Sequence, residues 1–168
     1  MKKLFPPYSF IVVFAIALTS CSTTSVAEEE GIFENEVSSK VVVELSPQEE
    51  ALIYLVNEYR ASKGLNPLEF SAEVYEYASD HNEYMISKGE LSHDHFASRA
   101  SMVSKITSAS FVAENVSKDY LLVDHALEGW LNSTAHRNTI EGDYTHTTLS
   151  IKVDAEGNPY YTQIFFRK

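Results

Sequence analysis

The spacing of apolar residues after position 45 predicts a chain that begins with helices and ends in a β-hairpin. In the first predicted helix, the side chains that share one face are Leu52, Leu55, Val56 and Tyr59. Residues 46–49, Ser-Pro-Gln-Glu, favour a helix start, because Ser caps the first turn, Pro fits its first position and an acid completes the capping box. Gly64 is suited to the left-handed cap, so we expect the helix to end at Lys63 and Gly64.

Three more helices and one short strand are expected before the hairpin. The second helix starts at a cap on Ser71 and runs to about Ser87, with an inward face made of Val74, Tyr77, Ala78, His81 and Met85. The third covers residues 96–105. The fourth covers residues 120–131, and its inward side chains are Leu122, Ala126, Leu127 and Trp130. Phe111 and Val112 are predicted to form a short strand.

The C-terminal part of the chain changes from helical to alternating spacing. Residues 147–153 and 160–166 alternate between apolar and polar side chains, and the segment 154–159 between them has the composition of a turn. This pattern predicts an antiparallel hairpin. Helices followed by such a hairpin indicate an α+β domain, with the helices packed on a small sheet.

The first 20 residues have the anatomy of a signal peptide. Lys2 and Lys3 precede an apolar run, residues 10–18, that is too short to span a bilayer comfortably. The run leads into Leu-Thr-Ser-Cys at residues 18–21, which resembles a bacterial lipobox, the motif whose Cys becomes the lipid-carrying first residue. The alternatives are an ordinary secretory signal or a buried thiol at Cys21. We expect lipidation at Cys21, because it is the single Cys of the chain and lies where lipidation requires it.

Charge and composition divide the mature chain into a tether and one domain. Residues 21–44 contain the acidic run Glu28-Glu29-Glu30 and are predicted to be a flexible acidic tether, while residues 45–168 are long enough for one core. Removing residues 1–20 takes away two lysines and no acid, which moves the formal charge from -11 to -13. Such an acidic protein is not expected to bind nucleic acid. We expect an extracytoplasmic protein that meets a bacterial membrane, an outer membrane or cell surface, only through the lipid on Cys21.

Five short motifs follow one another along the domain. They are Asn57-Glu58-Tyr59-Arg60, Ser92-His93-Asp94, Glu114-Asn115-Val116, Trp130-Leu131-Asn132-Ser133 with His136-Arg137, and Tyr161-Thr162-Gln163-Ile164-Phe165. In this order and spacing they resemble the CAP superfamily, which comprises cysteine-rich secretory, antigen 5 and pathogenesis-related class 1 proteins, and most of all its bacterial SCP-like extracellular branch. The resemblance covers residues 47–168.

The resemblance implies a fold and a site. The implied fold is an α–β–α sandwich with helices on both faces of a small antiparallel sheet. The implied site is an open cleft lined by His93, His136 and Glu114. The register favours His93 over the nearby His95, because an aromatic residue and Arg99 then fall where the family has them. In this class the ligands implied are small apolar or lipid-like molecules, or components of the cell envelope.

The three candidate residues are also chemically suited to a metal. Imidazole is the commonest protein ligand for metals, so His93 and His136 with a nearby carboxylate could hold zinc or another divalent ion. Glu114 would then be a ligand, a base that activates water, or an acceptor that orients an imidazole. Many eukaryotic members of the family have a second Glu where this chain has Ser133, so one carboxylate is missing. We therefore assign no catalytic residue; the candidates are His93, Glu114 and His136.

The remaining motif residues are expected to support the site. Asn115 is expected to hold its loop by side-chain bonds to the backbone. Arg137 is expected to be a structural ion-pair partner, and Ser133 to precede a turn that carries His136. His81 is interpreted as a structural residue of its helix.

Three functions remain open from the sequence. The favoured one is a lipid-anchored CAP-domain protein whose cleft binds a ligand at the cell envelope, with or without a divalent metal. The second is a metal-dependent hydrolase in which Glu114 activates water. The third is a protein–protein adaptor with a vestigial cleft. A serine hydrolase is not favoured, because no Gly-x-Ser-x-Gly elbow occurs.

Overall fold

The computed structural model of the protein describes residues 42–168. The expected signal peptide, the expected lipidation of Cys21 and most of the expected tether lie outside the described residues, so they stay predictions. Among the described residues, no helix has both the length and the apolar character needed to cross a membrane.

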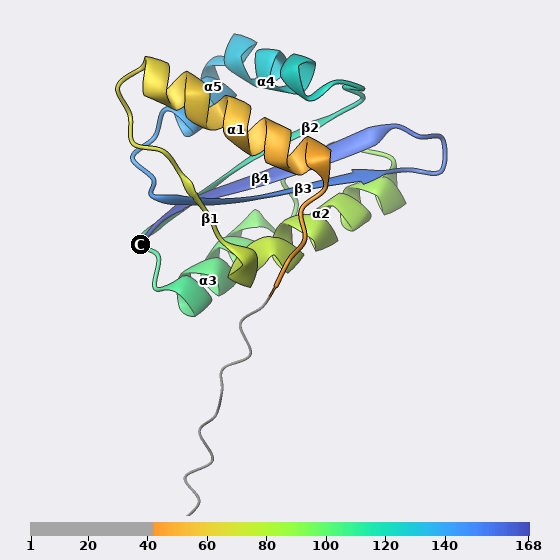
Figure 1. The fold of residues 1–168 in the computed structure, drawn as a ribbon. Coiled ribbons are helices and arrows are strands. Elements are labelled where there is room, and N and C mark those ends of the chain that lie inside the picture. The colour runs from red at the N-terminus through yellow and green to blue at the C-terminus, as the bar shows by residue number, and fades with distance from the viewer. Residues whose placement is uncertain (1–41) are drawn as a thin grey trace, which may run out of the picture. The chain divides into compact units, whose positions relative to one another are not determined.

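A four-stranded sheet lies between two layers of helices (Figure 1). One layer holds α2 (Tyr75–Lys88) and α3 (Phe96–Thr107), preceded by a short 3-10 turn, Ala72–Val74. The opposite layer holds α1 (Pro47–Ser62), α4 (Val123–Asn132) and α5 (Thr134–Ile140). The predicted α+β class and the α–β–α sandwich are therefore confirmed.

The sheet places its last two strands at its centre. Its order is β1-β3-β4-β2, with bounds of Glu69–Phe70 for β1, Phe111–Lys118 for β2, His146–Val153 for β3 and Pro159–Arg167 for β4. The predicted hairpin is β3 and β4, which pair antiparallel, as do β2 and β4. The two-residue strand β1 pairs parallel with β3, so the sheet is antiparallel except at this short edge.

The first helix is fixed at its start by the predicted capping box. The Ser46 hydroxyl and the Glu49 carboxylate each bond the backbone N–H of the other residue. The buried Glu49 carboxylate also accepts bonds from the Tyr75 hydroxyl (2.9 Å) and from the Ile151 backbone N–H (2.8 Å). One side chain therefore joins α1 to α2 and to β3.

The same helix buries its apolar face as its spacing predicts. Leu52 and Val56 are fully buried in the main core cluster. In that cluster they join Trp130 of α4 and Phe165 of β4, while Tyr59 packs at its margin.

The structure differs from the sequence prediction in the segment before α4. This helix begins at Val123 and not at Tyr120, because Leu122 is extended and the Tyr161 hydroxyl bonds the Tyr120 carbonyl. Leu122 is exposed and does not belong to the inward face.

Three other local expectations also change. Strand β2 continues well beyond Val112, so the Glu114-Asn115 motif lies on a strand and not in a loop. His136 lies within helix α5 and not in a turn. Ser71 forms no side-chain cap, because a 3-10 turn precedes α2.

Candidate functional site

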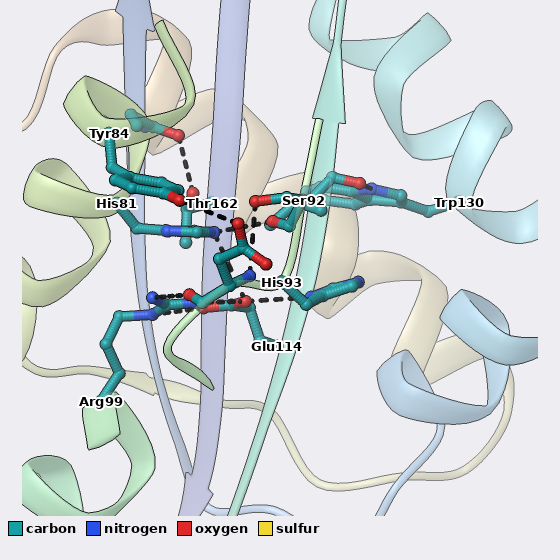
Figure 2. A network of polar contacts seen from close by, with 11 residues as sticks. His81, Tyr84, Ser92, His93, Arg99, Glu114, Trp130 and Thr162 are labelled. Carbon is teal, nitrogen blue, oxygen red and sulfur yellow. Dashed lines mark hydrogen bonds and ion pairs between the residues drawn. The ribbon is translucent and has the colours of Figure 1, made fainter. Parts of the chain in front are cut away.

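Glu114 lies at the centre of the candidate site. It belongs to the middle of β2, and its side chain is only 1% exposed. Arg99, one turn into α3, donates a hydrogen bond to each carboxylate oxygen. Its Nε is 2.9 Å from Oε2 and its Nη2 is 2.8 Å from Oε1 (Figure 2). Such a bidentate ion pair fixes the orientation of the carboxylate and stabilises its negative charge.

His93 joins the same carboxylate from the loop between α2 and α3. Its Nδ1 lies 3.0 Å from Glu114 Oε1, and its side chain is 51% exposed. Because an ionised carboxylate only accepts hydrogen bonds, Nδ1 of His93 is the donor in this bond. The His93 carbonyl in turn accepts the Phe96 N–H (3.1 Å) where α3 begins, which anchors the loop.

The charge of Glu114 follows from its partners. Burial raises the pKa of this carboxyl, but the hydrogen bonds from His93 and Arg99 outweigh burial and hold the pKa below its usual value. Glu114 is therefore a carboxylate at neutral pH.

His81 is a third group beside this carboxylate, although its sequence pattern indicated only a structural role. The side chain is 1% exposed, and Nε2 lies 2.8 Å from the Ser92 carbonyl and 3.7 Å from Glu114 Oε1. Burial lowers the pKa of His81, so its imidazole is neutral at neutral pH. Its helical spacing correctly predicted burial but gave no sign of the carboxylate on the neighbouring strand.

His136 reaches the site from the opposite helical layer. Asn115, next to Glu114 on β2, donates from Nδ2 to the His136 carbonyl (3.0 Å) and so ties α5 to the strand. Burial lowers the pKa of the His136 imidazole, and His93 lowers it further. His136 is thus close enough to His93 for the charge of His93 to act on it, and of the two only His93 bonds Glu114. We call this pair the two-histidine site.

The other motif residues act through the backbone. Arg137 donates from Nη1 to the Leu131 carbonyl (2.7 Å), so it links α5 to α4, and within residues 42–168 it forms no ion pair of the kind expected. The Ser133 carbonyl accepts the Arg137 N–H (2.9 Å), which starts α5. Asn115 forms the expected side-chain-to-backbone bond, but from a strand.

The described residues do not fit the divalent metal site that the sequence suggested. Residues 42–168 contain no group of three or more His, Cys, Asp or Glu side chains placed to hold a metal ion. Glu114 is also engaged by Arg99 through both oxygens. Of the roles considered for Glu114, the geometry matches the orientation of an imidazole.

The family comparison agrees with the fold and the motifs. The sequence model of the family described as "CAP: Cysteine-rich secretory protein family" matches residues 53–165. An uncharacterized membrane protein of Bacillus subtilis, YlbC, is 32% identical over 124 residues, which are 71% of this chain and 34% of YlbC. The chain therefore spans about a third of that relative.

Solved structures show the same fold. A cysteine-rich secretory protein of Staphylococcus aureus is 27% identical with a TM-score of 0.63, over 76% of this chain and 40% of that chain. An extracellular protein of Bacillus anthracis containing an SCP domain is 23% identical with a TM-score of 0.63, over 76% and 45%. An outer surface protein of Borrelia burgdorferi is 14% identical with a TM-score of 0.67, over 75% and 96%. The last two are similar in fold alone.

Proposed function

Because this chain belongs to the CAP family, the cysteine-rich secretory proteins, we propose that it is a ligand-binding protein of the cell envelope, anchored by lipid at Cys21. The similar proteins are described as extracellular, outer-surface or membrane proteins, which supports a place outside the cytoplasm. The two-histidine site is where the ligand binds.

The observation that carries this proposal is the fixed, half-exposed imidazole of His93. Glu114 accepts the hydrogen bond of its Nδ1, so in the neutral ring Nε2 is the hydrogen-bond acceptor of a side chain that is 51% exposed. Leu91, two residues earlier, leaves 44% of its surface exposed. An acceptor with an exposed apolar side chain two residues away in the chain suits a lipid-like molecule with a hydroxyl head group, whose O–H bonds Nε2 and whose chain covers apolar surface.

The hydrolase alternative is not favoured by this geometry. A general base must reach the water whose proton it takes. The Glu114 side chain is 1% exposed and bonds Arg99 and His93 instead. The adaptor alternative makes no use of the fixed imidazole, and a binding experiment on the two histidines separates it from ligand binding.

The test uses the full chain purified from membranes and decan-1-ol as the probe. NMR titration is expected to give saturable shifts at His93, and the double variant His93→Ala/His136→Ala is expected to weaken decanol binding at least about tenfold, the loss of one good hydrogen bond to a bound ligand. His125→Ala is the matched control, because His125 is an exposed histidine of α4. Equal decanol affinity in the double variant and the wild type would refute the two-histidine site. If the double variant still binds a protein partner as the wild type does, the adaptor is favoured. The Cys21→Ser variant is expected to be lost from the membrane fraction, and its retention there would refute the lipid anchor.

A further inference from the structure

A pocket of about 170 Å³ has Arg99 as one of its walls. It is formed by α2, by the loop that follows it and by α3. Its walls are Tyr77, Asp80, His81, Tyr84, His95 and Arg99. At about 30 Å³ per water, the space holds roughly five waters or one small organic molecule. It shares His81 and Arg99 with the surroundings of Glu114, but neither His93 nor His136 lines it, so it is distinct from the two-histidine site.

Aromatic rings dominate these walls. The His81 and Tyr84 rings are nearly parallel, with 13° between their planes and 6.0 Å between centroids. His95 meets Tyr84 edge-on at 5.4 Å. The Lys88 ammonium lies 5.7 Å from the Tyr84 ring centroid, which is a cation–π contact within the protein. Rings around a small space, with acids near, are the usual recognition device for organic cations.

The charges around the pocket favour a cation as well. The positive charge of Arg99 is matched by Glu114, which takes two of its N–H groups, while the Asp94 carbonyl takes a third at 2.7 Å. Asp80 lies on the exposed side of α2 and forms no ion pair with any other residue of the described part of the chain. Asp94 lies close by, held by the Tyr84 hydroxyl at 2.8 Å. The Lys88 ammonium beside the Tyr84 ring offsets one of these two negative charges, and the other leaves the pocket favourable to a cation.

His81 contributes an aromatic ring to the pocket wall and no accessible hydrogen-bonding atom. Its Nε2 must carry the proton, because it bonds the Ser92 carbonyl, which only accepts. Its Nδ1 is then an acceptor, and this atom is buried without a hydrogen-bond partner among residues 42–168. Because this atom is closed to solvent, a ligand in the pocket meets the ring of His81 and not its acceptor.

We propose that this pocket binds a small primary or secondary organic ammonium ion. Its N–H groups bond the Asp80 carboxylate, and its first carbons pack between the rings of Tyr77 and Tyr84. The proposal does not depend on the function proposed for the two-histidine site.

The experiment titrates butylammonium chloride into the full chain and follows the signals of His81 and Tyr84 by NMR. Butylammonium is expected to bind saturably. Tetramethylammonium, which has the charge but no N–H, is expected to bind at least about tenfold more weakly, and sodium butyrate not to bind, because one lost charged hydrogen bond is worth about a factor of ten or more. Butyrate binding as tightly as butylammonium would overturn the proposal.

Variants locate the site and separate it from the two-histidine site. Asp80→Asn is expected to weaken butylammonium binding about tenfold, and Glu76→Gln, an exposed acid of the same helix outside the pocket, to leave it unchanged. The double variant His93→Ala/His136→Ala is expected to bind butylammonium like the wild type. Unchanged affinity in a folded Asp80→Asn protein, verified by circular dichroism, would also overturn the proposal.

Discussion

Replacing Arg60 by methionine is expected to lower the free energy of unfolding by about 3–5 kcal/mol, one of the largest effects of any single change in this domain. Arg60 is fully buried near the end of α1. Its guanidinium donates to the carbonyls of Asn66 (2.9 Å), Ile140 (2.6 Å) and Gly142 (2.9 Å). Methionine fills much of the same space but donates no hydrogen bond, so these buried carbonyls lose their partner.

The bonds of Arg60 explain why the effect is concentrated in one residue. Two of the three carbonyls lie where α5 ends, 80 and 82 positions away along the chain. Burial lowers the pKa of the guanidinium, although an arginine stays charged throughout the usual pH range. Arg60→Met therefore removes the hydrogen bonds that join α1 to the end of α5, the helix that carries His136.

Urea denaturation of the full chain measures this loss. Lys105→Met is the matched control, since it removes one positive charge from an exposed position on α3 and is expected to change stability by less than about 0.5 kcal/mol. Arg60→Lys is expected to fall between the two, because an ammonium cannot bond the three carbonyls at once. Equal denaturation midpoints for Arg60→Met and Lys105→Met would contradict the role given to Arg60.

Replacing Glu114 by glutamine is expected to cost about 3 kcal/mol, near the lower limit for breaking a buried ion pair. The loss arises because Arg99, whose side chain is 11% exposed, keeps its charge but no longer faces a carboxylate. Glu83→Gln is the control: its partner Lys152 is on the surface, where an ion pair is worth less than about 1 kcal/mol. If urea denaturation shows the same loss of unfolding free energy for both variants, the Glu114–Arg99 ion pair does not stabilise the site as proposed.

The same pair predicts how stability depends on pH. The pKa of Glu114 is lower in the folded protein than its ordinary value of 4.5, so its contribution is fully present above that value. It is lost as the pH falls through the folded pKa, because the carboxyl must then take up a proton and release Arg99. The wild type is therefore expected to lose more stability than Glu114→Gln between about pH 6 and about pH 3. Parallel pH profiles for the two proteins would contradict this assignment.

The helical layers could be predicted from local patterns. The capping box at Ser46 and the apolar face of Leu52 and Val56 act within one helix, so short-range rules describe them. The β3–β4 hairpin is equally local. The start of α4 was missed because the tertiary bond between Tyr161 and the Tyr120 carbonyl decides it.

The candidate site was predicted only in part. The motifs indicated His93, Glu114 and His136, and the structure joins Glu114 to His93 by a hydrogen bond. They gave no hint that Arg99 would occupy both oxygens of Glu114, or that His81 would lie beside it. Both contacts join side chains of separate elements across the packed α2–α3 layer and β2, and no spacing within one element encodes them.

The proposed site depends on Glu114 acting as the acceptor that orients His93. The most direct measurement is the ¹⁵N imidazole spectrum of His93 in the full chain, recorded at a pH at which the spectrum itself shows the neutral ring, with the signals assigned by their loss in His93→Gln. We expect a proton on Nδ1 and a free lone pair on Nε2. A proton on Nε2, or a mixture of the two tautomers, would contradict this role of Glu114.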